Sequence, residues 1–154
     1  ESARKRGVVT PENLRLPRPM INSKDLNFSF SGLKTAVMYA AQKTEIDDDT
    51  REVFCMEFEN SVTDVITKKL ETATFLYNAE SVIIGGGVSA NTHIRSAINE
   101  VCKRDSIDLY LPKKDLSTDN ALMIAIIAMV KVLNGATPDS SDTLAAQSNL
   151  SIAN

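Results

Sequence analysis

The stretch that decides the fold is Ser81-Val82-Ile83-Ile84-Gly85-Gly86-Gly87. Its first four residues form a short, continuous apolar run, which is typical of a strand buried on both faces of a parallel sheet. The glycines end the strand, and apolar residues then recur at helical spacing over about 91–103. A second strand is expected over 108–111, where Pro112 stops it. Strand, helix and strand in this tight order predict a parallel pair joined by a crossover helix, hence an α/β fold.

The sequence outside this unit predicts further helices. A short helix ends at Gly7, and a proline-containing stretch over 8–27 then indicates a loop. Helices are expected from Ser31, which is placed to cap the first, and from 47–50, with Thr50 as the N-cap. The last helix is expected to open at Thr118 or Asp119. Its ten apolar residues over 121–130 are too few to cross a membrane, which needs roughly 20, so the helix should be buried.

Composition narrows the function classes. The chain has 154 residues, 43% hydrophobic, which is ample for a core, and we expect one domain over 1–154. The only histidine is His93, which excludes a metal site built from several histidines of this chain. Cys55 and Cys102 lie 47 residues apart in apolar segments, which predicts buried free thiols and a cytoplasmic location.

Charge is unevenly distributed along the chain. Residues 1–18 have five cations and two anions, a net charge of +3, whereas residues 45–64 have eight anions and one cation, a net charge of −7. Two interpretations stay open for these runs: ordinary solvated surface, or a basic edge that faces a partner. The overall charge of −3 argues against a free-standing nucleic-acid binder held by phosphate contacts.

A candidate site follows from the direction of the strands. The loops at 85–90 and 112–118 both leave the carboxyl ends of parallel strands, so they share the sheet edge where ligands bind in α/β proteins. Gly85 and Gly86 would let a phosphate approach the backbone, and Asn91 could hydrogen-bond a ligand from the first helical turn. Tight-turn packing explains the glycines equally well.

Two other features have chemical potential. Asp119, 28 residues after Asn91, could cap its helix or hold a divalent metal. The stretch Asn27-Phe28-Ser29-Phe30-Ser31-Gly32-Leu33-Lys34 alternates like a short strand before a helix and leaves Lys34 available to an anion, although helix capping explains its serines equally well.

Three blocks in this order resemble a known family. FSFSGLKTAV (Phe28–Val37), IIGGGVSAN (Ile83–Asn91) and LSTDNALMIA (Leu116–Ala125) are similar to the C-terminal half of the tRNA threonylcarbamoyladenosine-forming transferases. The bacterial member was formerly called O-sialoglycoprotein endopeptidase. The resemblance implies an actin-like, sugar-kinase-like and Hsp70-like ATPase fold of two lobes, with this chain as most of the C-terminal lobe and its inserted helices.

The resemblance also implies chemistry. The family transfers threonylcarbamoyl from threonylcarbamoyl-AMP to the adenosine beside the tRNA anticodon. Asn91 matches its adenylate-binding asparagine, with Gly85 and Gly86 at the phosphates, and Asp119 matches the carboxylate ligand of an iron or zinc ion. The other metal ligands are two histidines of an HxxxH helix in the N-terminal lobe, which this chain lacks, so we expect the chain alone to be inactive. Expected partners are tRNA, the N-terminal lobe, an inactive paralogue and a small ATPase, with no membrane.

Two alternatives have the same fold. A non-catalytic scaffold paralogue would have no reason to keep Asp119, and a generic ATPase lobe would not require the FSFSGLK string. The former peptidase label finds no support, because no nucleophile, base and orienting group can be assembled from the sequence.

Overall fold

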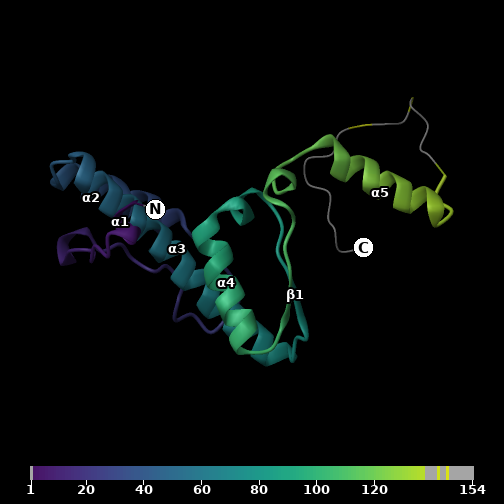
Figure 1. The fold of residues 1–154 in the computed structure, drawn as a ribbon, viewed down its shortest axis with the longest axis horizontal. Coiled ribbons are helices and arrows are strands. Elements are labelled where there is room, and N and C mark those ends of the chain that lie inside the picture. The colour runs from purple at the N-terminus through teal and green to yellow at the C-terminus, as the bar shows by residue number, and fades with distance from the viewer. Residues whose placement is uncertain (1, 138–141, 143–144, 146–154) are drawn as a thin grey trace. The chain divides into compact units, whose positions relative to one another are not determined.

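The computed structural model describes residues 2–137, 142 and 145 (Figure 1). The chain divides into two compact units, Glu1–Ser117 and Thr118–Asn154, which are described separately. The first unit contains four helices, two strands and three short 3-10 turns among its described residues: α1 (Ser2–Lys5), η1 (Glu12–Leu14), α2 (Ser31–Lys43), α3 (Asp48–Tyr77), β1 (Ser81–Ile83), η2 (Gly87–Ala90), α4 (Thr92–Arg104), β2 (Asp108–Tyr110) and η3 (Lys114–Leu116). This mixture of helices and a small parallel sheet agrees with the predicted α/β class.

The two strands pair in parallel, as predicted. Ser81 lies opposite Asp108 and Ile83 lies opposite Tyr110. The prediction that the first strand is buried on both faces is wrong, because only Val82 is buried and Ile83 is 80% exposed. Within the first unit the hydrophobic contacts of Val82 are with residues of α4, α3 and β2, so one face of the strand is covered and the other is open.

Helix α3 contributes residues to both hydrophobic clusters of the first unit. Near its N-terminal end, buried residues of the 8–27 loop, α2 and α3 form one core cluster: Leu14, Leu16, Leu33, Val53 and Phe54. Farther along, α3 packs with β1 and α4 in a second cluster of Val82, Ile94, Ile98 and Cys102. Figure 1 shows α4 lying beside α3, in agreement with their contacts. The strand–helix–strand element is therefore fixed to one long helix.

Helix starts differ from the predicted ones by one to three residues. Asp47 caps α3 by accepting a 2.7 Å hydrogen bond from the Thr50 amide, so Thr50 is the donor and not the predicted cap. Phe30 occupies the N-cap position of α2 without a side-chain hydrogen bond, and the predicted cap Ser31 is the first helical residue. Asp47 is the better cap for α3 because its carboxylate accepts a hydrogen bond from the amide of the third helical residue. The positive end of the helix dipole also stabilises that carboxylate.

Three arginines of the basic run pair with carboxylates of the acidic run. Arg4 pairs with Glu59 at 3.0 Å, Arg6 pairs with Glu52 at 2.6 Å, and Arg18 pairs with Glu57. These three arginines therefore bind the acidic side of α3 within the molecule. Ordinary surface pairing accounts for these three arginines, and a basic edge that faces a partner stays a prediction.

The described part of the second unit contains one helix, α5 (Ala121–Leu133), capped by Asn120, which accepts a 3.0 Å hydrogen bond from the Met123 amide. The expected opening at Thr118 or Asp119 is thus one or two residues early. No α5 residue is buried, and the described residues of this unit provide no second helix or strand to cover it, unlike the predicted buried helix. The prediction of a single domain over 1–154 stays a prediction.

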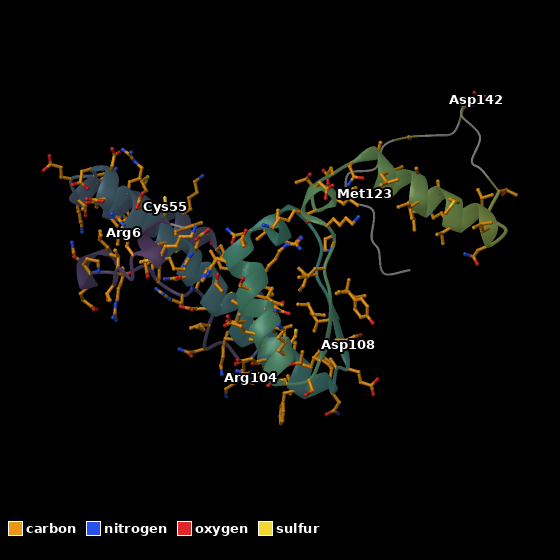
Figure 2. All side chains as sticks on the ribbon, viewed as in Figure 1. Arg6, Cys55, Arg104, Asp108, Met123 and Asp142 are labelled. Carbon is orange, nitrogen blue, oxygen red and sulfur yellow. The ribbon has the colours of Figure 1, made fainter. Side chains whose placement is uncertain are left out.

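The structure also bears on the predicted burial of the cysteines and on whether a helix could span a membrane. Cys102 is buried as predicted, but Cys55 of α3 is exposed (Figure 2). None of the helices within the described ranges is long and apolar enough to cross a bilayer. The tail from Pro138 lies almost wholly outside the described residues.

Candidate functional site

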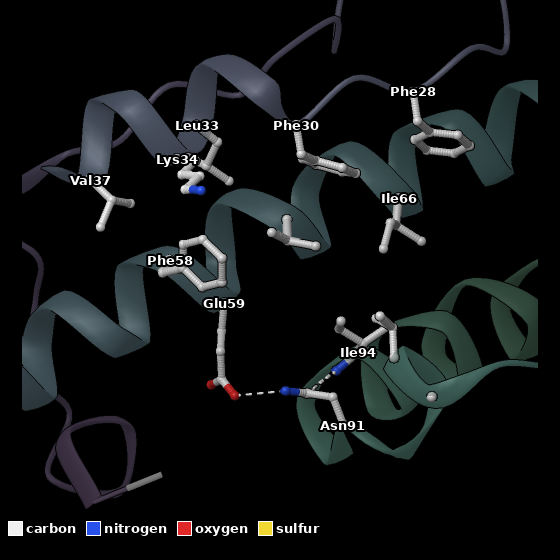
Figure 3. Close-up of a pocket in the computed structure, with 13 residues that line it drawn as sticks. Phe28, Phe30, Leu33, Lys34, Val37, Phe58, Glu59, Ile66, Asn91 and Ile94 are labelled. Carbon is white, nitrogen blue, oxygen red and sulfur yellow. Dashed lines mark hydrogen bonds between the residues drawn. The ribbon is translucent and has the colours of Figure 1, made fainter. Parts of the chain in front are cut away.

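A pocket of about 750 Å³ lies in the first unit between the start of α2, the middle of α3 and the loop at 85–90, called the glycine loop below (Figure 3). Its lining is mainly apolar and includes three phenylalanines, and it brings together two of the three sequence blocks that are similar to the transferase family. The lining residues are Phe28, Phe30, Leu33, Lys34, Val37, Phe58, Glu59, Val62, Ile66, Gly87, Val88, Asn91 and Ile94. A mostly apolar pocket with a few convergent polar groups is the usual form of a small-molecule site.

Asn91 lies on the pocket wall and caps α4. Its Oδ1 accepts hydrogen bonds from the amides of His93 and Ile94 at 2.9 and 3.1 Å. Its Nδ2 donates to Glu59 Oε1 at 2.8 Å (Figure 3). Both lone pairs of the carbonyl oxygen are therefore used, whereas one of the two N–H donors remains for a ligand. The structure gives Asn91 a capping role and leaves it one donor.

Glu59 lies in a chain of polar contacts that starts at α1. Arg4 Nη1 donates to Glu59 Oε2 at 3.0 Å, while Arg4 Nη2 donates to the Asn60 side chain at 2.7 Å. Burial raises the pKa of Glu59, but the hydrogen bonds from Asn91 and Arg4 outweigh it and bring the pKa below its ordinary value. The carboxylate therefore stays ionised and acts only as an acceptor, which orients the Asn91 amide.

The glycine loop has open space in front of two backbone positions. Gly86 has φ +83° and ψ 165°, a conformation that favours glycine. Gly85 has no such angle, and a Cβ built on it or on Gly86 meets no atom within 4 Å. Tight-turn geometry thus explains Gly86, whereas neither packing nor backbone conformation explains Gly85. Gly87 lines the pocket, whereas Gly85 and Gly86 do not, so the open space at Gly85 lies beside the pocket wall and leaves room for a ligand without indicating one.

Arg95 of α4 connects the two loops that leave the strands. Its guanidinium donates to the Ser89 carbonyl in the glycine loop and to the Pro112 carbonyl at 2.8 Å and Ser117 Oγ at 2.9 Å in the other loop. Ser117 is buried and donates in turn to the Lys113 carbonyl at 3.1 Å. The predicted proximity of the two loops at one sheet edge is confirmed, with Arg95 as the physical link.

Asp119 lies in the second unit, two residues after Ser117, and is exposed. Asn120 caps α5, so the capping interpretation of Asp119 is wrong. Among the described residues no group of three or more His, Cys, Asp and Glu side chains could hold a metal ion. Asp119 therefore offers one carboxylate, and a metal bound there needs other ligands.

Sequence reasoning missed Glu59, Phe58 and Arg95. Glu59 was counted in the acidic run, but it lies three and seven residues before Val62 and Ile66, which a helix places on the same face. That spacing could have identified Glu59 as a pocket residue. Arg95 gives no such signal, because its acceptors are two backbone carbonyls and a serine that only the fold brings together.

Comparisons with known proteins agree on one family. The family model for tRNA N6-adenosine threonylcarbamoyltransferase (TsaD) matches residues 1–126. Relatives with that name include one from Nitrosomonas europaea, 40% identical over 121 residues, covering 79% of this chain and 36% of the relative. Another, from Thermosipho africanus, is 38% identical over 136 residues, covering 88% of this chain and 41% of the relative. The chain spans about two fifths of the length of these curated relatives.

Proposed function

Because the chain belongs to the tRNA N6-adenosine threonylcarbamoyltransferase family, we propose that it is the C-terminal lobe of a transferase with an actin-like, two-lobed fold. The complete protein transfers threonylcarbamoyl from threonylcarbamoyl-AMP to an adenosine of tRNA. The observation that supports this most directly is the pocket shared by the glycine loop, Asn91 and the Phe28–Lys34 segment.

The adenylate occupies the α4 side of the pocket. The adenine lies against the apolar side chains of α3 and η2, among them Phe58 and Val88, because a flat base buries its faces well on such a surface. The phosphate lies at the glycine loop, where the open space at Gly85 permits close approach to the backbone. Asn91 donates its remaining Nδ2 hydrogen to the nucleotide.

The transfer is an acyl transfer to nitrogen. The N6 atom of the tRNA adenosine bonds to the carbamoyl carbon, and the bond from that carbon to the phosphate oxygen breaks. AMP leaves with the electron pair of that bond, and N6 gives up one proton to solvent. This chain contributes binding and orientation, since holding two reactants in place removes much of the entropic barrier.

Asp119 would supply one ligand to a metal ion, iron or zinc, that would be shared with the N-terminal lobe. An exposed carboxylate that caps no helix suits this role, but the described residues do not form a metal centre by themselves. When bound, such an ion polarises an oxygen of the reacting carbamoyl or phosphate group. The other ligands, like part of the nucleotide contacts, come from the N-terminal lobe.

The chain therefore needs partners. We propose that it is inactive without the N-terminal lobe, and that the complete enzyme works in the cytoplasm. An inactive paralogue and a small ATPase are the protein partners expected for this family. tRNA is the second substrate, as the name of the family implies.

The test is to fill the pocket. Val88→Trp replaces an exposed side chain on the pocket wall, so it should lower AMP affinity at least tenfold in calorimetry on the complete protein while preserving the free energy of unfolding. Leu76→Trp is the matched control, since Leu76 is similarly exposed but lies outside this pocket. If Val88→Trp binds AMP as tightly as the wild type, the adenylate site is elsewhere.

A further inference from the structure

We propose that Phe28 and Lys34 form the platform that receives the acceptor adenosine of tRNA. The platform lies at the α2 end of the pocket, whereas the glycine loop and Asn91 lie at its α4 end (Figure 3). This inference rests on the proposed function, because it names where the second substrate binds. It assigns a role to the Phe28–Lys34 segment, which the adenylate does not require.

Aromatic rings line the pocket. Phe28 lines the pocket although its side chain is 52% exposed, and Phe30 lies beside it with ring centroids 6.3 Å apart and planes inclined by 20°. Phe58 of α3 faces the same space and is also exposed. Exposed aromatic rings are the surfaces on which proteins stack unpaired bases of single-stranded nucleic acid.

A buried lysine of α3 holds the segment that precedes Phe28 in place. Lys69 of α3 is 3% exposed, and its ammonium donates to Ser23 Oγ and to the Asp25 carbonyl. Asp25 in turn accepts a 3.0 Å hydrogen bond from the Asn27 amide. Burying a lysine is costly unless its charge is paired and hydrogen-bonded, so this contact fixes a chain segment that leads directly to an exposed ring.

Lys34 brings a positive charge to the pocket. Lys34 lines the pocket in the first turn of α2, and no described carboxylate forms an ion pair with it, unlike Arg4, Arg6 and Arg18. No side-chain hydrogen bond caps α2, and the Leu33 and Lys34 amides of its first turn donate to the Phe30 carbonyl. The Lys34 ammonium is a point charge that suits a phosphate of the RNA backbone. Base stacking on Phe28 and a phosphate contact at Lys34 are the two kinds of contact by which proteins hold single-stranded RNA.

The volume of the pocket limits what it can hold. A volume of about 750 Å³ is in the upper part of the range of about 300–1,000 Å³ for pockets that bury one drug-sized ligand. With the adenylate at the α4 end, the α2 end of this volume is assigned to a second base. The base must leave its stack in the RNA to enter, as in other enzymes that act on a base. Its N6 amine then faces the carbamoyl group from within the same pocket.

The test uses a tRNA anticodon stem-loop in which 2-aminopurine replaces the acceptor adenosine, because stacking on an aromatic ring quenches its fluorescence. With the complete protein, Phe28→Leu should abolish the quenching and lower stem-loop affinity about tenfold, as expected for the loss of one stacking contact. Phe28→Trp should keep both. AMP affinity should be unchanged in the two variants.

Tyr39→Leu is the matched control, because Tyr39 is 55% exposed on α2 but does not line the pocket. The platform is refuted if folded Phe28→Leu quenches the probe like the wild type, if Phe28→Trp loses quenching, or if Tyr39→Leu loses as much affinity. Failure of the proposed function looks different, since AMP would then bind normally to Val88→Trp.

Lys34 has its own readout. Lys34→Gln should weaken stem-loop binding and reduce the slope of log affinity against log salt concentration by about one, as expected for one lost phosphate contact. Lys43→Gln, at the other end of α2, should leave the slope unchanged. An unchanged slope in Lys34→Gln would overturn the phosphate contact.

Discussion

Glu59 and Asn91 are joined by a 2.8 Å hydrogen bond that connects the middle of α3 to the N-terminus of α4. The carboxylate accepts from the amide, and the same carboxylate accepts from Arg4 on its other oxygen. Because the Asn91 carbonyl is fully used by the helix cap, this bond fixes the direction of the only donor left for a nucleotide. Glu59 is thus a positioning residue for the proposed adenylate site.

Removing the carboxylate should release that amide. We expect Glu59→Ala to lower AMP affinity about fivefold to tenfold and to reduce the free energy of unfolding by about 1 kcal/mol, because two hydrogen bonds from part-exposed partners are lost. Glu59→Gln should retain most AMP affinity, since its carbonyl can still accept from Asn91. Glu52→Ala is the control, an exposed α3 carboxylate paired with Arg6. Calorimetry and urea unfolding measure both effects, and equal AMP affinity in Glu59→Ala would contradict the role.

The buried carboxylate of Glu57 should make stability depend on acid. Burial raises its pKa, but the Arg18 guanidinium and the Leu16 amide outweigh burial and hold the pKa below its ordinary value of 4.5. A carboxylate with a lowered pKa stabilises the fold fully above its unfolded pKa, and this stabilisation is lost as pH falls through the folded pKa. Urea unfolding should therefore show stability falling below about pH 4.5.

Glu57→Gln should flatten that acid limb, and Arg18→Ala should cost about 2–3 kcal/mol at pH 7. This is less than a fully buried pair loses, because a quarter of Arg18 is exposed. Arg51→Ala, which removes an exposed pair with Asp48, should change stability by less than about 0.5 kcal/mol. An acid limb that persists in Glu57→Gln would assign it to other carboxylates.

Local sequence signals predicted the elements of the first unit well. The apolar run ended by three glycines identified β1, and helical spacing identified α2, α3 and α4. Those signals depend on hydrophobic period and backbone freedom, which act over a few residues. They could not decide which of several nearby polar residues caps a helix, and so Asp47 and Asn120 were missed. The cap depends on which side chain reaches the free amide.

Long-range pairing lay beyond the sequence. For the basic residues of 1–18 the sequence left open an ordinary solvated surface or an edge that faces a partner, because nothing local shows that α3 passes beside them. Burial on both faces was predicted for β1 from composition alone, but the number of covering layers depends on the remaining chain, and here one face stays open. The site itself was predicted only in part: Asn91 lines the pocket, but the predicted Gly85 and Gly86 do not, and Glu59 and Arg95 required the fold.

Gly85 and Gly86 should respond differently to alanine. Gly85→Ala adds a methyl group in open space at an ordinary backbone angle, so we expect unchanged stability and at least tenfold weaker AMP binding in calorimetry. Gly86→Ala forces a left-handed φ of +83° on alanine and should cost about 1–3 kcal/mol of stability. Gly32→Ala, also in open space but on α2, is the control. Normal AMP affinity in Gly85→Ala would refute a phosphate at this loop.

Asp119 should affect the metal and leave the helix intact. Because Asn120 caps α5, Asp119→Asn should leave helix content by circular dichroism unchanged. In the complete protein it should reduce bound iron or zinc at least tenfold by elemental analysis, along with transfer activity. Asp115→Asn, an exposed aspartate of η3, should leave the metal content intact. Full metal occupancy in Asp119→Asn would exclude it as a ligand.

Arg95 should hold the two strand-end loops together through its shape as well as its charge. A lysine has one ammonium, which cannot reach the Ser89 carbonyl together with Pro112 and Ser117 as the guanidinium fork does. We therefore expect Arg95→Lys to cost about 1–2 kcal/mol of stability, close to Arg95→Gln, with faster amide hydrogen exchange in η2 and η3. Arg104→Lys is the control, since Arg104 has exposed carboxylate partners that a lysine can also meet. If Arg95→Lys keeps the wild-type exchange rates in both loops, charge alone suffices and the clamp geometry has no role.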